Sequence, residues 1–382
     1  MRKVLVPVAA LAVAAIVAGF AIADDGKGNR REFTFAVGLW GDLPYSSEQA
    51  NPGVPNLIAD MNNAGLVFSV HNGDLKAGRA NATPPSVTCD DQLYADAKSM
   101  FDSLKEPAIF TPGDNDWTDC DRVENGPFNS LERLDYERHV FFSTDRSLGQ
   151  KTLQQEVQKT PLCKGFKSGT AATTTEYTNV PCVENRRWTY KNVTFATLNV
   201  QGTCNNRCSS GTGDPAGDDV EWAARNAADL QWLKDTFATA KAHGSAGVMI
   251  IWQADVGFDE SGYQGAPKRR STTLVETDGA PDGVRELVWE LRSQTIAFGK
   301  PVVLVHGDSH YFMVDKPLKD VDGKRIENFT RVEAFGDNAA NDLNDVHWVK
   351  ALVDPESRDV FAFQAQTVPG NVVAHNNPPF SP

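Results

Sequence analysis

Short apolar runs along the chain end abruptly in polar loops that contain glycine and aspartate. Residues 33–40 (FTFAVGLW) lead into Gly41-Asp42, residues 66–71 (LVFSVH) into Asn72-Gly73-Asp74, and residues 108–111 into Pro112-Gly113-Asp114. Segments at 55–63 and 92–104 follow the first two loops and repeat apolar residues at helical spacing. Strands that alternate with helices in this way predict an α/β fold, whose strands direct their carboxyl ends towards a common site.

The same alternation returns in the second half of the chain. Strands are predicted at 193–200 and at 247–252, just before Gln253, and helices at 220–243 and 284–298. The run at 301–305 leads into His306-Gly307-Asp308-Ser309-His310, and the tail alternates as strands at 331–335, 346–353 and 359–365. Residues 149–192 are polar and rich in threonine, so we expect an irregular, disulfide-containing insertion within a single domain over 33–366.

The polar loops supply a candidate site. Loops at the carboxyl ends of parallel strands meet at one edge of a sheet, so we expect these side chains to cluster: Asp42, Asp74, Asp114, Gln253, Asp308 and His310. Carboxylates packed together repel one another and raise their own pKa values unless a cation lies among them. The pattern therefore predicts a metal site. The alternative is a set of independent turns, because Gly-Asp is common in turns.

Charge and the first residues narrow the class of protein. The chain of 382 residues carries a formal net charge of −13, which argues against a surface for nucleic-acid phosphates or acidic lipids. A basic start, an apolar run and an A-x-A site ending at Ala23 predict a signal peptide over 1–23. We expect a secreted or periplasmic protein with no membrane span after cleavage. The alternative is an uncleaved anchor, because the apolar run approaches spanning length.

Six cysteines form an even set in a chain that we expect to be exported, so disulfides are predicted. We favour pairing in sequence order: Cys89–Cys120, Cys163–Cys182 and Cys204–Cys208. The alternative is zinc ligation, which the sequence disfavours because it has no C-x-x-C pair and no histidine within a few residues of any cysteine.

The order of the motifs resembles that of the calcineurin-like metallophosphoesterases, whose signature is D-x-H, G-D, G-N-H-[DE], a lone histidine after a strand, and G-H-x-H. Asp42 in GDLPY matches the first aspartate and Asp74 in NGDLK the metal-bridging aspartate. Asp114 in GDNDW matches the asparagine ligand, and Gln253 in IIWQAD the lone histidine. In GDSH, Asp308 replaces the first histidine and His310 matches the second. The resemblance covers residues 33–366.

This resemblance implies a sandwich of two packed mixed β-sheets flanked by helices. It also implies an exported phosphoesterase that uses two divalent cations to hydrolyse a small-molecule phosphate ester or an exported phosphorylated compound. One cation would bind a first set of ligands, Asp42, Asp74 and His310, and the other would bind a second set, Asp74, Asp114, Gln253 and Asp308. Oxygen-rich ligand sets favour Mg²⁺, Mn²⁺ or Ca²⁺, with iron and zinc as further candidates.

Departures from the signature keep a second hypothesis open, that of a non-catalytic member of the fold that binds a metal or another ligand. Pro44 stands where D-x-H has its histidine, and Tyr45 beside it either supplies a phenolate oxygen or packs under the strand edge. Asn115 replaces a histidine that helps protonate the leaving group or hold the phosphate, and asparagine donates hydrogen bonds but is no general acid. The resemblance gives Asn115 and His310 as the catalytic residues.

Three further features have structural as well as functional interpretations. His71 and His306 each precede a Gly-Asp loop, where they either support the site from behind or simply pack. The acidic run Asp114, Asp116, Asp119 and Asp121 could bind calcium, but it lacks the glycine and terminal glutamate of an EF-hand. A solvated loop pinned by Cys120 is the favoured interpretation.

Overall fold

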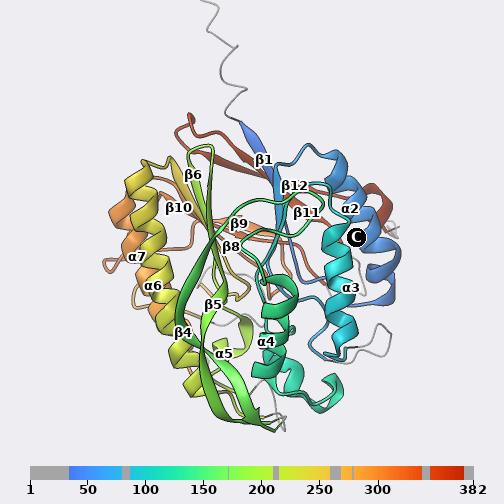
Figure 1. The fold of residues 1–382 in the computed structure, drawn as a ribbon. Coiled ribbons are helices and arrows are strands. Elements are labelled where there is room, and N and C mark those ends of the chain that lie inside the picture. Colours follow the sequence, from blue (N-terminus) through green and yellow to red (C-terminus); the bar gives the residue numbers. More distant parts are fainter. Residues whose placement is uncertain are drawn as a thin grey trace, which may run out of the picture. The chain divides into compact units, whose positions relative to one another are not determined.

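Two mixed β-sheets lie at the centre of the described fold, with helices on either side (Figure 1). The first sheet has the order β12-β11-β1-β2-β3, and the second has the order β4-β5-β6-β7-β8-β10-β9. The computed structural model describes residues 34–79, 87–170, 172–209, 215–258, 268–277, 279–337 and 345–373. Contacts divide the chain into Met1–Glu32 and Phe33–Pro382, and all described residues belong to the second unit. The predicted signal peptide lies outside the described residues.

The strands of the first sheet are β1 (Phe35–Trp40), β2 (Phe68–His71), β3 (Ala108–Phe110), β11 (Trp348–Val353) and β12 (Phe361–Gln366). Those of the second are β4 (Glu156–Gly169), β5 (Thr174–Tyr190), β6 (Val193–Thr197), β7 (Gly247–Ile251), β8 (Val302–His306), β9 (Met313–Asp315) and β10 (Phe329–Glu333). The longer helices are α2 (Val54–Asn63), α3 (Asp91–Asp102), α4 (Ser130–Phe141), α6 (Asp219–His243) and α7 (Arg285–Phe298). Short helical segments are η1 (Gln49–Gly53), η2 (Thr118–Asp121), η3 (Val123–Asn125), α5 (Gly202–Asn205) and η5 (Pro369–Asn371).

Both faces of β7 are covered, which explains why this strand has no polar residue. In β7, Val248 and Ile250 pack with residues of α6 and α7, whereas Met249 and Ile251 belong to the apolar layer between the sheets. On the far side of the first sheet, Trp40 packs with residues of α2 and α3. Apolar and polar residues alternate along a strand that has one exposed face, but a strand that is buried on both faces does not need this alternation. The predicted sandwich of two mixed sheets flanked by helices is confirmed.

Parallel pairing brings the predicted loops to one edge of each sheet. β1, β2 and β3 run parallel to one another, and so do β6, β7, β8 and β10. The loops after β1, β2, β3, β7 and β8 carry Asp42, Asp74, Asp114, Gln253 and Asp308 in that order. This arrangement produces the convergence that the sequence pattern predicts.

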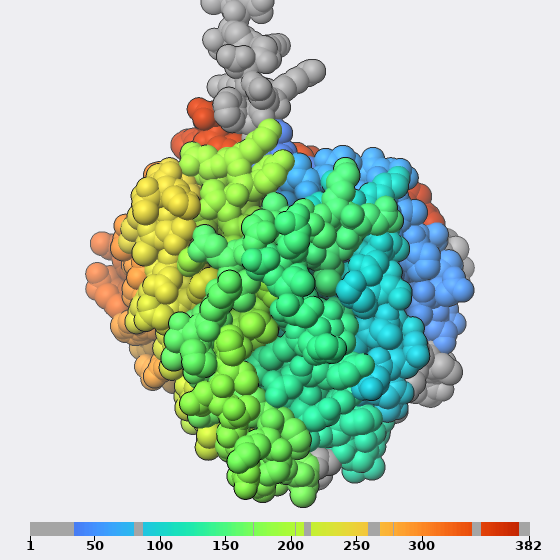
Figure 2. Space-filling view, viewed as in Figure 1, coloured from blue at the N-terminus to red at the C-terminus, as the bar shows by residue number. Residues whose placement is uncertain are grey.

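The expectation of irregular structure over 149–192 is wrong. The segment contains β4 and β5, a long antiparallel hairpin that extends the second sheet and lies on the surface beside α4 (Figures 1 and 2). Much of β4 is exposed and the pairing shifts register several times, so the hairpin shows little of the alternation that marks a half-buried strand. The disulfide Cys163–Cys182 joins its two strands.

The three disulfides pair in the predicted order. Besides Cys163–Cys182, Cys89–Cys120 connects the segment before α3 to the loop after β3, and Cys204–Cys208 closes a tight loop after β6. The long helix α6 is also confirmed, with Asp218 as its N-cap and Gly244 as its C-cap. Among the helices of the described residues, none is both long and apolar enough to cross a bilayer.

Candidate metal site

Four of the predicted site residues have left-handed backbone conformations. Asp42 has a φ of 53°, Asp74 of 62°, Asp308 of 73° and His310 of 64°. Non-glycine residues adopt this region rarely and at a cost of about 1–3 kcal/mol each, so the surrounding structure must stabilise it. Such strained residues concentrate at functional sites.

The glycines of the Gly-Asp loops allow neighbouring loops to approach closely. A Cβ atom at Gly113 would lie 2.0 Å from Oδ1 of Asp74, and one at Gly307 would lie 2.0 Å from Oδ2 of Asp42. Real Cβ atoms do not approach other atoms so closely, so a side chain at either glycine would displace a carboxylate. Two of the four Gly-Asp loops therefore have a packing cause for their glycine, because Gly113 and Gly307 each make room for the aspartate of another loop.

Asp42, Asp74 and His310 form a group that could hold a metal ion. Each offers one ligand atom, and the three atoms lie within 4.8 Å of one another. Oδ1 of Asp42 accepts a hydrogen bond from the backbone N–H of Asp308 at 3.0 Å and lies 3.6 Å from Nε2 of His310. The other oxygen, Oδ2, is buried and has no hydrogen-bond partner within the described parts of the chain. A buried carboxylate oxygen without a partner fits a position for a cation.

Asp74 is held by hydrogen bonds to both of its carboxylate oxygens. Its Oδ2 accepts from the Tyr45 hydroxyl at 2.8 Å, from Nδ2 of Asn115 at 2.9 Å and from Nε2 of Gln253 at 3.1 Å. Its Oδ1 accepts from the backbone N–H of Asn115 at 3.2 Å. Tyr45 therefore acts as a hydrogen-bond donor, and burial raises the pKa of its hydroxyl, which argues against the phenolate considered from the sequence.

Gln253 lies at the centre of the second predicted set of ligands. Its Nε2 also donates to Oδ1 of Asp114 at 3.0 Å, and its Oε1 accepts from the backbone N–H of Gly202 at 2.6 Å. Asp308 lies close by, because a Cβ atom at Gly202 would be 2.6 Å from Oδ1 of Asp308 and 3.0 Å from Oδ2 of Asp114. The structure thus brings all six residues of the predicted cluster together, with the nitrogen of Gln253, and not its oxygen, facing the carboxylates.

Burial is the main cause of the raised pKa values of Asp42, Asp74 and Asp308. Repulsion from neighbouring carboxylates raises these pKa values further, and Asp114 contributes to all three. Backbone N–H groups oppose the shift at Asp42 and Asp308. A cation would reverse this balance and favour the charged carboxylates.

His310 has a pKa lowered to about 4, mainly because it is buried, although the charge of Asp114 acts in the opposite direction. Its contact with Asp42 is therefore no ion pair near neutral pH. The neutral imidazole is the form that binds metals. The His310 side chain is 20% exposed whereas that of Asp42 is 0% exposed, so the group is open on the histidine side.

Asp116 organises the loops although the motif match gives it no role. It is fully buried, and its Oδ2 accepts from the backbone N–H groups of Asp74 at 2.9 Å and Gly113 at 2.8 Å. The prediction of a solvated acidic loop is therefore wrong. Asp119 is buried as well and forms an ion pair of 2.6 Å with Arg122. The sign in the sequence of the role of Asp116 in organising the loops was its place as the second aspartate in GDNDW.

His71 and His306, which precede the site loops, are buried and have lowered pKa values. His71 packs its ring edge-on against Trp40 and accepts from the backbone N–H of Gly73 at 3.3 Å. His306 lies 2.9 Å through Nδ1 from the carbonyl oxygen of Gly307. Both histidines therefore contact the backbone of the site loops from behind.

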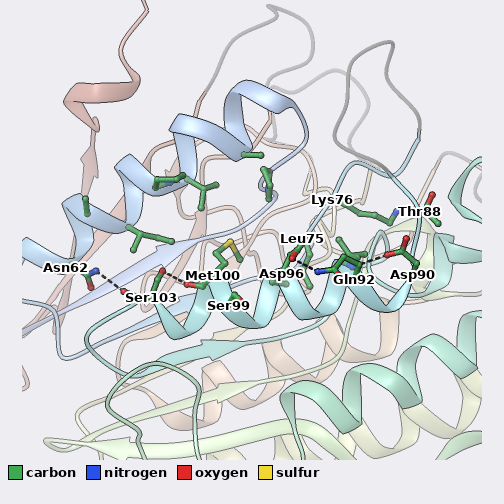
Figure 3. A pocket seen from close by; sticks show the side chains of 18 residues that line it. Asn62, Leu75, Lys76, Thr88, Asp90, Gln92, Asp96, Ser99, Met100 and Ser103 are labelled. Carbon is green, nitrogen blue, oxygen red and sulfur yellow. Dashed lines mark hydrogen bonds between the residues drawn. The ribbon is translucent and has the colours of Figure 1, made fainter.

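A cavity of about 740 Å³ lies between α2 and α3, away from the predicted ligands (Figure 3). Its lining includes Ile58, Leu93 and Met100, and the predicted ligands are not part of it. Leu75 and Lys76, which follow Asp74, also line it, so the cavity borders the back of that loop.

No protein-family model matches the sequence, and a search of curated proteins finds no match. Solved structures of similar fold include a dimetal phosphatase from Danio rerio, with a TM-score of 0.45, 11% identity, and coverage of 87% of this chain and 96% of that one. A protein described as GAP50, the anchor in the inner membrane complex of Plasmodium, has a TM-score of 0.43 and 10% identity, with 87% and 88% covered. A 5'-nucleotidase from Candida albicans SC5314 has a TM-score of 0.39 and 9% identity, with 86% and 50% covered, so this chain spans half its length.

Proposed function

We propose that this chain is an exported phosphoesterase that depends on a divalent cation, as a divergent member of the calcineurin-like metallophosphoesterases. The observation that carries the proposal is the group that Asp42 forms with Asp74 and His310, because Oδ2 of Asp42 is buried and accepts no hydrogen bond from the described residues. A cation would complete this group and offset the repulsion among the carboxylates around it.

Two carboxylates and one imidazole suit several divalent ions. The oxygen-rich surroundings favour Mg²⁺, Mn²⁺ or Ca²⁺, and the imidazole keeps iron and zinc as candidates. When bound, the cation would polarise a phosphoryl oxygen and lower the pKa of a coordinated water. The resemblance implies a second cation among the other ligands, Asp74, Asp114, Gln253 and Asp308, where the amide of Gln253 lies.

Backbone and side-chain donors around the group hold its members in place. Asp308 fixes Asp42 through its backbone N–H, and Tyr45 and Asn115 fix Asp74. His310 is the most open member of the group, so we propose that the phosphoryl group binds on its side. Asn115 and His310 are the proposed catalytic residues, Asn115 as an amide donor and His310 as the ligand nearest the substrate.

The proposed substrate is a phosphate ester, either a small molecule or an exported phosphorylated compound. We propose that residues 1–23 are a cleaved signal peptide and that residues 33–366 form the domain. Three disulfides agree with a secreted or periplasmic location, because they persist in oxidising compartments.

A second candidate function is binding without turnover. It is favoured by Asn115, which offers no general acid and whose amide is engaged by Asp74 and Tyr45. Asp42 and Asp74 are only 0% and 1% exposed, which also favours binding without turnover. Substrate atoms would reach the group of Asp42, Asp74 and His310 only from the His310 side.

The test is hydrolysis of 4-nitrophenyl phosphate by the purified mature protein with Mn²⁺ or Mg²⁺ and with a chelator. We expect turnover with a cation and none with the chelator, and at least a hundredfold loss in Asp42→Asn. The matched control is Asp96→Asn, an exposed position on α3, which should keep full activity. Metal binding without turnover of any ester would favour the binding protein.

A further inference from the structure

The amide of Gln253 occupies the position that the resemblance gives to a second cation. Its two N–H groups point at two carboxylates, Oδ2 of Asp74 at 3.1 Å and Oδ1 of Asp114 at 3.0 Å. The resemblance implies that Asp74 and Asp114, which accept from this amide, would instead hold that cation. The amide nitrogen thus donates hydrogen bonds to two carboxylate oxygens that would otherwise be available to bind a metal.

The orientation of this amide is fixed by a third contact. Its Oε1 accepts from the backbone N–H of Gly202 at 2.6 Å. If the amide were flipped, its oxygen would face the oxygens of Asp74 and Asp114, and its NH₂ group would face another N–H donor. Gln253 is therefore held with its nitrogen towards the carboxylates, and it does not present the oxygen that a cation needs.

The space around the amide is also filled. Gln253 is fully buried, and a Cβ atom at Gly73 would lie 2.8 Å from its Cγ. On the opposite side, the backbone of Gly202 lies against Asp308 and Asp114. A cation with ligands at about 2.0–2.6 Å would have to displace the amide from between the carboxylates.

The first position differs in its hydrogen bonds. Among the described residues, Oδ2 of Asp42 has no donor, whereas Oδ2 of Asp74 already accepts from three. We infer that the chain binds a single divalent cation, at Asp42, Asp74 and His310, and that the amide of Gln253 replaces the second. This inference rests on the cation site of the proposed function and specifies it further.

The experiment is a Mn²⁺ titration by calorimetry, with the bound metal counted after gel filtration. The variants are Gln253→His, Gln253→Glu and the matched control Gln158→His, which changes a buried glutamine of β4 that donates to the Ala228 carbonyl. We expect one Mn²⁺ per chain in the unaltered protein and the control, and two in at least one Gln253 variant. Electron paramagnetic resonance should then show coupled Mn²⁺ ions only in a Gln253 variant. Circular dichroism verifies that each variant folds.

The outcomes separate this inference from the function on which it rests. Two Mn²⁺ ions in the unaltered protein would overturn the inference and leave the phosphoesterase proposal intact. One ion in every folded Gln253 variant would also overturn it, because the amide would then not be what excludes the second cation. No bound Mn²⁺ in the unaltered protein would refute the cation site itself.

Discussion

Acidification should destabilise the protein through His71, which is buried on β2 beneath the loop that carries Asp74. Burial lowers the pKa of His71 from 6.5 to about 3. Between these two values the unfolded chain binds a proton at His71 and the folded chain does not. The free energy of unfolding therefore falls as the pH falls below about 6.5.

The size of the effect follows from the two pKa values. At pH 5.5 protonation of His71 stabilises the unfolded chain by RT ln 11, about 1.4 kcal/mol, and at pH 7.5 by less than about 0.1 kcal/mol. The folded pKa lies well below both pH values, so the unfolded state sets the difference. We predict a loss of about 1.3 kcal/mol from this one residue between pH 7.5 and 5.5.

The perturbation that isolates this effect is His71→Phe. A phenyl ring suits the surroundings, because His71 packs against Trp40, Phe101 and Phe110. The variant loses the acceptor for the Gly73 N–H, which should cost about 1 kcal/mol at every pH. The His71→Phe variant should therefore be less stable than the unaltered protein at pH 7.5. Between pH 7.5 and 5.5, its free energy of unfolding should fall by about 1.3 kcal/mol less than that of the unaltered protein.

Urea unfolding of both proteins at pH 7.5 and 5.5, with a chelator present, measures this difference. All other titrating groups are common to the two proteins and cancel in the comparison. Equal losses of stability in the two proteins would refute the reasoning, because His71 would then bind its proton equally well in the folded state.

Three further predictions concern the site and the disulfides. Gly307→Ala should abolish tight Mn²⁺ binding in a folded protein, because its methyl group would stand 2.0 Å from Oδ2 of Asp42, and calorimetry checks this. Replacing Cys89 and Cys120 together by serine should lower the free energy of unfolding by about 3–4 kcal/mol, because the disulfide closes a loop with a sequence separation of 31. Urea unfolding without reductant measures this loss. Any phosphatase activity should favour aryl over alkyl phosphate esters, because Asn115 supplies no proton to the leaving group. Asn115→His should reduce the difference in kcat/KM between the two kinds of ester. Equal rates for both esters in the unaltered protein would contradict this prediction.

The set of clustered residues could be predicted from sequence because strand geometry determines it. Once 33–40 and 66–71 are identified as parallel strands of one sheet, their carboxyl ends must share an edge, and Asp42 and Asp74 follow directly. Gln253 follows β7 of the other sheet and reaches Asp74 because the two sheets pack against each other. No side-chain orientation is needed for the first of these steps.

The orientation of Gln253 could not be predicted in the same way. It depends on the N–H of Gly202, a backbone group far away in the sequence, and the letter Q gives no sign of which end of the amide faces the carboxylates. The sequence therefore suggested an oxygen ligand where the structure has a nitrogen donor.

Helix α4 was not predicted from the sequence, and the physical reason is a different one. Its buried face mixes Leu134 with the charged residues Glu137 and Arg138, and Arg138 pairs with Glu184 of β5 at 2.7 Å. Buried ion pairs of this kind hide the apolar periodicity on which helix prediction relies.

The central claim, a divalent cation held by Asp42, Asp74 and His310, is tested most directly by anomalous diffraction from crystals of the mature protein grown with Mn²⁺. We predict an anomalous peak in contact with a carboxylate oxygen of Asp42, a carboxylate oxygen of Asp74 and an imidazole nitrogen of His310. A map without density there, at a Mn²⁺ concentration that supports activity, would contradict the account, as would Mn²⁺ bound only at other residues.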